Sequence, residues 1–124
     1  MTIKEKLEQL KKAAKENQIS PDDARAGHWV MIEESRGAIR LKTIDRTTEA
    51  TLFIGTSKVR RNKMRISHSD WAWSDVTVLQ EEDAREIYAC LKTSRLMRQI
   101  SEALSNPAEV PVRLAEEIEA AWNR

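Results

Sequence analysis

The stretch that decides the fold is AIRLKTID, residues 38–45, in which apolar and polar side chains alternate. Ile39 and Leu41 fall on one side of an extended chain, and Arg40 and Lys42 fall on the other. Strict alternation of this kind is typical of a β-strand with one buried face and one face in water. The sequence therefore predicts an antiparallel sheet whose open face is basic.

Further strand signals lie on both sides of this stretch, at the roughly 8–12-residue spacing that is typical of antiparallel strands in series. The other expected strands are the apolar run WVMI at 29–32, the alternating segments 49–54 and 63–68, and the segment 75–79. We therefore predict a β-meander of four or five strands over residues 28–79. The segment 58–63 between two of them is interpreted as a loop.

Helical periodicity flanks the meander. Ile3, Leu7, Leu10 and Ala14 recur at spacings of three and four, which places them on one stripe of a helix over residues 1–18. The same spacing predicts helices over 81–104 and 112–122. The fold class is therefore α+β, with an N-terminal helix, the antiparallel meander, and two C-terminal helices packed on one face of the sheet. We expect residues 1–124 to form a single domain.

Composition excludes several classes of protein. The chain has 124 residues, of which 33% are charged, and its formal net charge is +1. A single cysteine cannot form an internal disulfide or a cysteine-built zinc site. No apolar run approaches the roughly 18 residues that a membrane-spanning helix needs. We expect a soluble, cytoplasmic protein that contacts no membrane and carries no metal or other cofactor.

Charge is unevenly distributed along the chain. Residues 36–65 hold nine bases and two acids, which gives a charge of +7. The remaining residues hold twelve bases and eighteen acids, which gives −6. A field of one sign over one face attracts polyanions such as nucleic acids. The alternative is that these bases pair with the acidic helices and form an ordinary hydrated surface with no binding role.

The basic strands predict a nucleic-acid interface, with single-stranded nucleic acid as one candidate ligand. Arg40, Lys42, Lys63 and Arg65 are expected to share the open face of the sheet. Cations on such a face displace counterions from phosphates, and aromatic side chains stack on bases. Phe53 is the stacking candidate, although it could instead pack under a helix or a loop. The predicted phosphate-contacting residues are Arg40, Lys42, Lys58, Arg60, Arg61, Lys63 and Arg65.

The stretch SDWAWSD, residues 69–75, supports a second hypothesis. Tryptophan is enriched in binding hot spots, so Trp71, Trp73 and the near-terminal Trp122 are candidate partner-binding residues. The alternative for each is packing in the core. On this hypothesis the protein is an interaction module that inhibits or adapts a larger protein. Docking of a terminal helix on a second copy, which gives a homodimer, explains an exposed apolar stripe equally well.

Catalysis is not expected. His28 and His68 lie outside any two-histidine ligand motif, and Cys90 lies on a helix among apolar residues. The sequence contains neither a phosphate-binding glycine loop nor a nucleophile elbow. We therefore expect a binding or regulatory protein without an active site.

The order of a basic strand meander followed by an amphipathic helix is similar in outline to small single-strand-binding proteins of the whirly kind. The similarity covers about residues 27–104 as a pattern and matches no signature residues. It implies an antiparallel sheet that binds single strands. The extra N-terminal helix and the long acidic C-terminal part depart from that plan.

Overall fold

The computed structural model describes residues 1–122, with the side chains described through residue 121. Residues 1–90 form one compact unit, and the residues from 91 on form a second. Helix α2 (Glu81–Ser105) runs through the boundary between them. The prediction that the whole chain folds as one domain stays a prediction.

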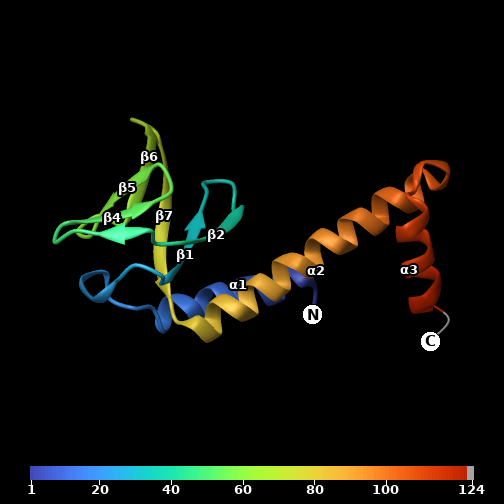
Figure 1. Cartoon of the computed structure of the whole chain (residues 1–124), viewed down its shortest axis with the longest axis horizontal. Coiled ribbons are helices and arrows are strands. Elements are labelled where there is room, and N and C mark those ends of the chain that lie inside the picture. The colour runs from blue at the N-terminus through green and yellow to red at the C-terminus, as the bar shows by residue number, and fades with distance from the viewer. Residues whose placement is uncertain (123–124) are drawn as a thin grey trace. The chain divides into compact units, whose positions relative to one another are not determined.

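The α+β class is confirmed, with an N-terminal helix, antiparallel strands and two C-terminal helices (Figure 1). The first helix and the strands are α1 (Ile3–Glu16), β1 (Trp29–Glu33), β2 (Ile39–Thr43), β3 (Arg46–Thr47), β4 (Thr51–Ile54), β5 (Ser57–Arg60), β6 (Arg65–Ser69) and β7 (Ala72–Leu79). After α2, a short turn of 3-10 helix (Pro107–Glu109) leads into α3 (Val112–Trp122), and another such turn (Pro21–Asp23) follows α1.

The strands form two sheets rather than one meander of four or five strands. One sheet has the order β2-β1-β7-β6, and the other has the order β3-β4-β5. The additional strand β5 overlaps the segment that was expected to be a loop. Its sequence, SKVR, has one apolar residue, Val59, so the alternation is too faint to predict a strand. Val59 is nevertheless fully buried, because the β4–β5 hairpin turns it toward the other sheet.

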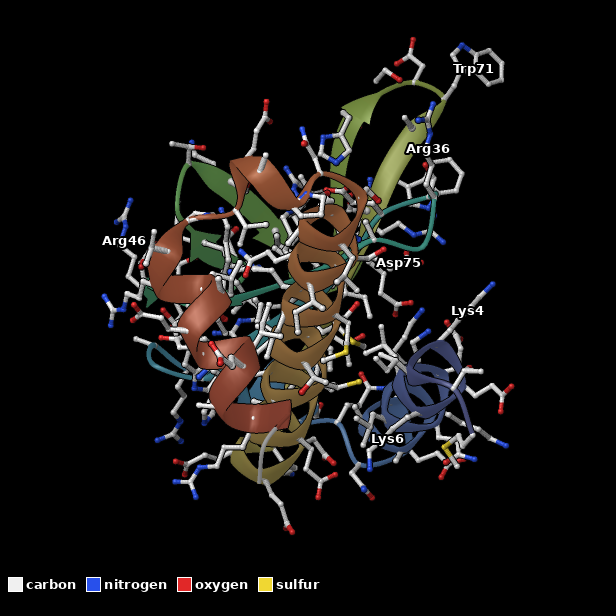
Figure 2. All side chains as sticks on the ribbon, turned by 90° about the vertical axis from the view of Figure 1, so that its right-hand side faces the viewer. Lys4, Lys6, Arg36, Arg46, Trp71 and Asp75 are labelled. Carbon is white, nitrogen blue, oxygen red and sulfur yellow. The ribbon has the colours of Figure 1, made fainter. Side chains whose placement is uncertain are left out.

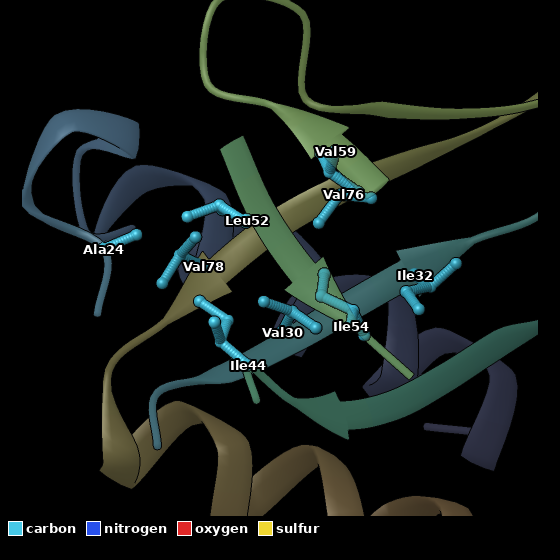
Figure 3. Close-up of a cluster of buried hydrophobic side chains, with 9 residues drawn as sticks. All are labelled: Ala24, Val30, Ile32, Ile44, Leu52, Ile54, Val59, Val76 and Val78. Carbon is cyan, nitrogen blue, oxygen red and sulfur yellow. The ribbon is translucent and has the colours of Figure 1, made fainter. Parts of the chain in front are cut away.

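The core lies between the two sheets, where apolar side chains from both sheets meet (Figure 3). Leu52, Ile54 and Val59 come from the three-stranded sheet, and β1 and β7 supply the facing residues. This burial is the main stabilising contribution to the unit, since each fully buried aliphatic side chain contributes about 1.5–3 kcal/mol. The complete cluster is Ala24, Val30, Ile32, Ile44, Leu52, Ile54, Val59, Val76 and Val78.

The chain passes from one sheet to the other at Ile44. The Ile44 backbone amide donates to the His28 carbonyl oxygen, which extends the β1–β2 ladder by one residue. The next amide, that of Asp45, donates to the Phe53 carbonyl oxygen on β4. The chain continues from this corner directly into the short strand β3, so the two sheets are joined here.

Helix α1 is attached to the first sheet by a charged cluster. Thr2 caps the helix, since its hydroxyl oxygen accepts from the Glu5 amide at 3.1 Å. The Lys11 and Lys15 ammonium groups lie 3.4 and 2.9 Å from the two carboxylate oxygens of Glu33 on β1. Because Lys11 and Glu33 are nearly buried, this pairing fixes where α1 lies on the sheet.

Within the described residues, no helix combines the length and the apolar character that crossing a bilayer requires.

Candidate nucleic-acid interface

The outer surface of the three-stranded sheet carries a cross-strand row of Arg46, Phe53 and Lys58. The register pairs Phe53 with Arg46 on one side and with Lys58 on the other. Directly paired residues of antiparallel strands point to the same face. Since Leu52 and Val59 point into the core, this row points away from it. Arg60 lies on the same surface, opposite Thr51. We name Arg46, Phe53, Lys58 and Arg60 the outer face.

Phe53 is half-buried, and the Arg46 guanidinium carbon lies 4.0 Å from the centre of its ring. Such a contact is a cation–π interaction that also shields the ring from water. The sequence left open whether Phe53 faces solvent or packs under other elements; its ring lies on the outer surface of the sheet, half-buried, with an arginine over one face. Arg46 was not among the predicted site residues. The sequence alone does not show that Arg46 pairs with Phe53. That pairing depends on the tight β3–β4 turn, in which the Thr48 amide donates to the Thr51 carbonyl oxygen and so sets the register of the two strands.

The cations of the outer face have no carboxylate partner among the side chains that the structure describes. Within the described side chains, no Asp or Glu oxygen lies within 4.0 Å of the charged nitrogens of Arg46, Lys58 or Arg60. The nearby Asp45 carboxylate is engaged locally, since it accepts from the Gly55 amide at 2.7 Å. The outer face is thus a solvent-exposed surface with three uncompensated positive charges. The alternative that these bases pair with acidic helices does not hold for these three residues.

Arg61 differs from its neighbour Arg60, because its side chain is hydrogen-bonded to backbone carbonyl groups of this chain. Its guanidinium donates to the carbonyl oxygens of Pro21 and Ala24, the latter at 3.0 Å. The same group donates twice to the Thr48 carbonyl oxygen, at 3.0 and 3.2 Å. A guanidinium used in this way joins the turn after α1 to the β3–β4 turn. The expectation that Arg61 is free to contact phosphate is therefore wrong.

The sequence predicted that four cations share one open face of the sheet, and this prediction is wrong. The four are Arg40, Lys42, Lys63 and Arg65. Arg40 pairs with Ile32, whereas Arg65 pairs with Asp75, whose other neighbour is Glu33. Adjacent residues of β1 point to opposite faces, so Arg40 and Arg65 lie on opposite faces of the four-stranded sheet. They also lie on its two edge strands.

Salt bridges engage two of these four cations. Arg40 lies 3.2 Å from the Glu34 carboxylate, and Arg65 lies 3.3 Å from that of Asp75. Lys42 is exposed at its sheet edge and Lys63 in the turn before β6. Lys63 and Arg65 help to line a shallow hollow along β6, together with Asn62, Ser67, Ser69, Asp70 and Trp73.

Trp71 and Trp73 lie in the β6–β7 hairpin. We name residues 65–75 the Trp hairpin. Trp71 is at its tip and is 91% exposed, far from Arg46 (Figure 2). Trp73 is 45% exposed, and the Arg65 guanidinium carbon lies 4.9 Å from its ring centre. The alternative of core packing is therefore wrong for both. Trp122 ends α3, and its side chain lies outside the described residues.

Each histidine takes part in a local hydrogen bond. The Arg25 amide donates to His28 Nδ1 at 3.0 Å, and His68 Nε2 lies 2.8 Å from the Ser74 hydroxyl oxygen. Cys90 is buried, with its sulfur 4.0 Å from the Ile3 carbonyl oxygen. In the part of the chain that the structure describes, no three histidine, cysteine or acidic side chains gather closely enough to hold a metal ion.

Comparison with known proteins gives no assignment: no family model, no curated protein and no solved structure matches this chain.

Proposed function

We propose that this protein is a small, non-enzymatic nucleic-acid-binding protein of a regulatory kind, and that the outer face contacts single-stranded nucleic acid. The observation that carries the proposal is the row Arg46–Phe53–Lys58, with Arg60 beside it. It combines a planar stacking group with cations that no described carboxylate neutralises.

The chemistry of this row suits a flexible strand better than a rigid duplex. Bases stack on aromatic rings and on arginine planes, and both kinds of surface need bases that are unpaired. The Arg46 guanidinium, supported from below by Phe53, offers such a plane. Lys58 and Arg60 are then in position to neutralise phosphates along the strand. We expect the interface to bind without preference for nucleotide sequence, because all of these contacts are to phosphate groups or to the faces of bases.

The experiment is fluorescence-anisotropy binding to labelled single-stranded DNA, single-stranded RNA and duplex DNA at several salt concentrations. The test variant replaces Arg46, Lys58 and Arg60 together by alanine. The matched control replaces Lys4, Lys6 and Lys12 on α1 by alanine, which removes the same charge from another surface of the same unit (Figure 2 labels Lys4 and Lys6).

We expect the wild type to bind single strands more tightly than duplex, with affinity falling steeply as salt rises. For single strands each phosphate contact adds about 0.7 to the slope of log affinity against log salt. The outer-face variant, which removes the two phosphate contacts of Lys58 and Arg60, should therefore shallow the slope by about 1.4, whereas the α1 variant should keep it. Equal losses in the two variants would mean that only net charge matters. Either that result or no binding at low salt refutes the proposal.

A second candidate function rests on a different observation, the near-complete exposure of Trp71. Large apolar side chains exposed at a hairpin tip are typical of protein-interaction hot spots. On this proposal the Trp hairpin binds a larger protein, which this chain inhibits or adapts. The cytoplasmic location expected from the sequence stays a prediction under both proposals.

The test of this second function compares immobilised wild type with Trp71→Ala, and uses Tyr88→Ala as the control because Tyr88 is also an exposed aromatic residue. A specific partner should be retained by the wild type and by Tyr88→Ala, and lost by Trp71→Ala. Identical retention by all three proteins would exclude the Trp hairpin as the interface.

A further inference from the structure

The first unit carries a second arginine–aromatic stack besides the one on the outer face. The Arg65 guanidinium carbon lies 4.9 Å from the centre of the Trp73 ring. Trp73 points away from the core, because its neighbour Ser74 is buried and adjacent residues of a strand point to opposite faces. Since Trp73 is 45% exposed, a ligand has access to this stack. The stacking chemistry of Arg46 and Phe53 is thus present twice, and we name Arg65 and Trp73 the second stack.

The second stack borders the hollow along β6, which we name the β6 hollow. Its volume of about 630 Å³ lies within the roughly 300–1,000 Å³ that is typical of small-ligand sites. Lys63 and Arg65 line it, and the Lys63 ammonium has no carboxylate oxygen within 4.0 Å among the described side chains. The other polar lining residues, which suit a base edge or a sugar hydroxyl, are Asn62, Ser67, Ser69 and Asp70. The β6 hollow therefore combines a stacking plane, cations for phosphate and hydrogen-bonding groups, which are the contacts that a nucleotide needs.

The β5–β6 turn connects the outer face to the β6 hollow. The Lys63 and Met64 amides both donate to the Arg60 carbonyl oxygen, at 3.0 and 2.9 Å, which places Lys63 one tight turn away from the outer face. Arg61 ties this turn to carbonyl groups elsewhere in the unit, so its shape is fixed before any ligand binds. The side chains of Arg60, Asn62 and Lys63 are exposed. Positive charge therefore continues from one surface to the other at the edge where β5 and β6 lie side by side (Figure 1).

We propose that a single strand bound to the outer face continues round the β5–β6 turn and stacks a second base in the β6 hollow. This inference rests on the proposed function and adds the course of the strand over the protein. The two stacks lie on opposite outer surfaces of the packed sheets, since both point away from the core between them. Packed sheets are about 10 Å apart, so the strand has to pass round an edge. The β5–β6 edge offers Arg60 and Lys63, neither of which has a carboxylate partner among the described side chains.

The length of the strand separates the two contacts. The row from Arg46 to Lys58 crosses three strands, or about 10 Å. Four stacked nucleotides span about 14 Å at about 3.4 Å each, which is enough for this row alone. About fifteen nucleotides span about 50 Å, which is enough for the row, the edge and the β6 hollow. Both lengths lie within the range of about 4–16 nucleotides that single-strand-binding domains occupy.

The test is fluorescence anisotropy with labelled oligothymidylates of about four and about fifteen nucleotides, from low salt upward. Trp73→Ala removes the ring of the second stack, and Lys63→Ala removes an exposed cation at the turn. Trp71→Ala is the matched control, because it removes the same type of side chain from the same hairpin but outside the β6 hollow. The outer-face variant tests the proposed function in the same assay.

We expect the wild type to bind the longer strand more tightly than the shorter one. Trp73→Ala should lower the affinity for the longer strand about tenfold and change that for the shorter strand by less than about twofold, since the stacking of one base is lost. Lys63→Ala should shallow the salt slope for the longer strand by about 0.7, and it decides the question alone if Trp73→Ala does not fold. Trp71→Ala should bind both strands as the wild type does.

The outcomes separate this inference from the proposed function. If the wild type binds neither strand at low salt, or the outer-face variant binds both as tightly as the wild type, the proposed function fails and this inference fails with it. If the outer-face variant binds both strands weakly, but Trp73→Ala and Lys63→Ala bind the longer strand as the wild type does, only this inference is overturned. Equal losses for the two lengths in Trp73→Ala, or the same loss in Trp71→Ala, also overturn it.

Discussion

Replacing Arg61 by alanine should destabilise the first unit strongly, although its neighbour Arg60 should tolerate the same change. Arg61→Ala removes a charged donor from the carbonyl oxygens of Pro21, Ala24 and Thr48. A hydrogen bond to a charged group contributes about 1.5–3 kcal/mol when it is well shielded. Arg61 is half-buried, so water replaces part of each bond. We take about 1 kcal/mol for each carbonyl, or about 3 kcal/mol in the free energy of unfolding.

The assay is urea unfolding followed by tryptophan fluorescence, together with a thermal melt. A loss of about 3 kcal/mol corresponds to a fall of about 10–20 °C in Tm for a domain of this size. Arg60→Ala is the matched control, because it removes the same side chain from an exposed position, and it should change stability by less than about 0.5 kcal/mol. If Arg61→Ala destabilises the protein no more than Arg60→Ala does, the structural role assigned to Arg61 is refuted.

The remaining predictions concern the α1 attachment, the Trp hairpin and the stacking pair. Glu33→Gln should lower the free energy of unfolding by about 1–3 kcal/mol, because it leaves the nearly buried Lys11 with only the exposed Glu8 as a carboxylate partner. Glu8→Gln should lower it by less than about 0.5 kcal/mol, and equal losses in urea unfolding would contradict this account. Trp71→Ala should leave Tm unchanged within error, since the side chain is almost wholly exposed, and a clear fall in Tm would show packing that the structure lacks. Phe53→Leu should weaken single-strand binding about tenfold through the loss of the ring beneath Arg46, and unchanged affinity in the anisotropy assay would remove stacking from the proposal.

Hydrophobic periodicity was sufficient to predict the α+β class and most of the elements. The alternation at residues 39–43 corresponds to β2, and the three-and-four spacing from Ile3 to Ala14 corresponds to α1. Strand β5 was missed because one apolar residue, Val59, gives no detectable period. The second sheet was missed for a related reason. Its formation depends on the corner at Ile44, where consecutive amides bond to different sheets, and no local pattern indicates such a change of partner.

The sequence predicted the positive charge of the candidate site but not how its residues are arranged. The sequence located the basic tract but left open whether Phe53 is exposed or packed. It could not distinguish Arg60 from Arg61, because adjacent arginines have the same local pattern and only the folded chain brings the carbonyl groups of Pro21 and Thr48 to one of them. The sequence also could not show that Arg40 and Arg65 lie on opposite faces. Their strands, β2 and β6, are the two edges of the sheet, and the faces follow only from how each edge pairs with the central strands β1 and β7.

The central claim is that the outer face is where nucleic acid binds, and an NMR titration tests it most directly. The measurement follows backbone amide signals of the labelled protein as a single-stranded oligonucleotide of about ten nucleotides is added, a length within the site sizes of sheet-based single-strand binders. The account predicts that the largest shifts fall on Arg46, Phe53, Lys58 and Arg60. Shifts confined to the Trp hairpin, or no shifts at low salt, would contradict it.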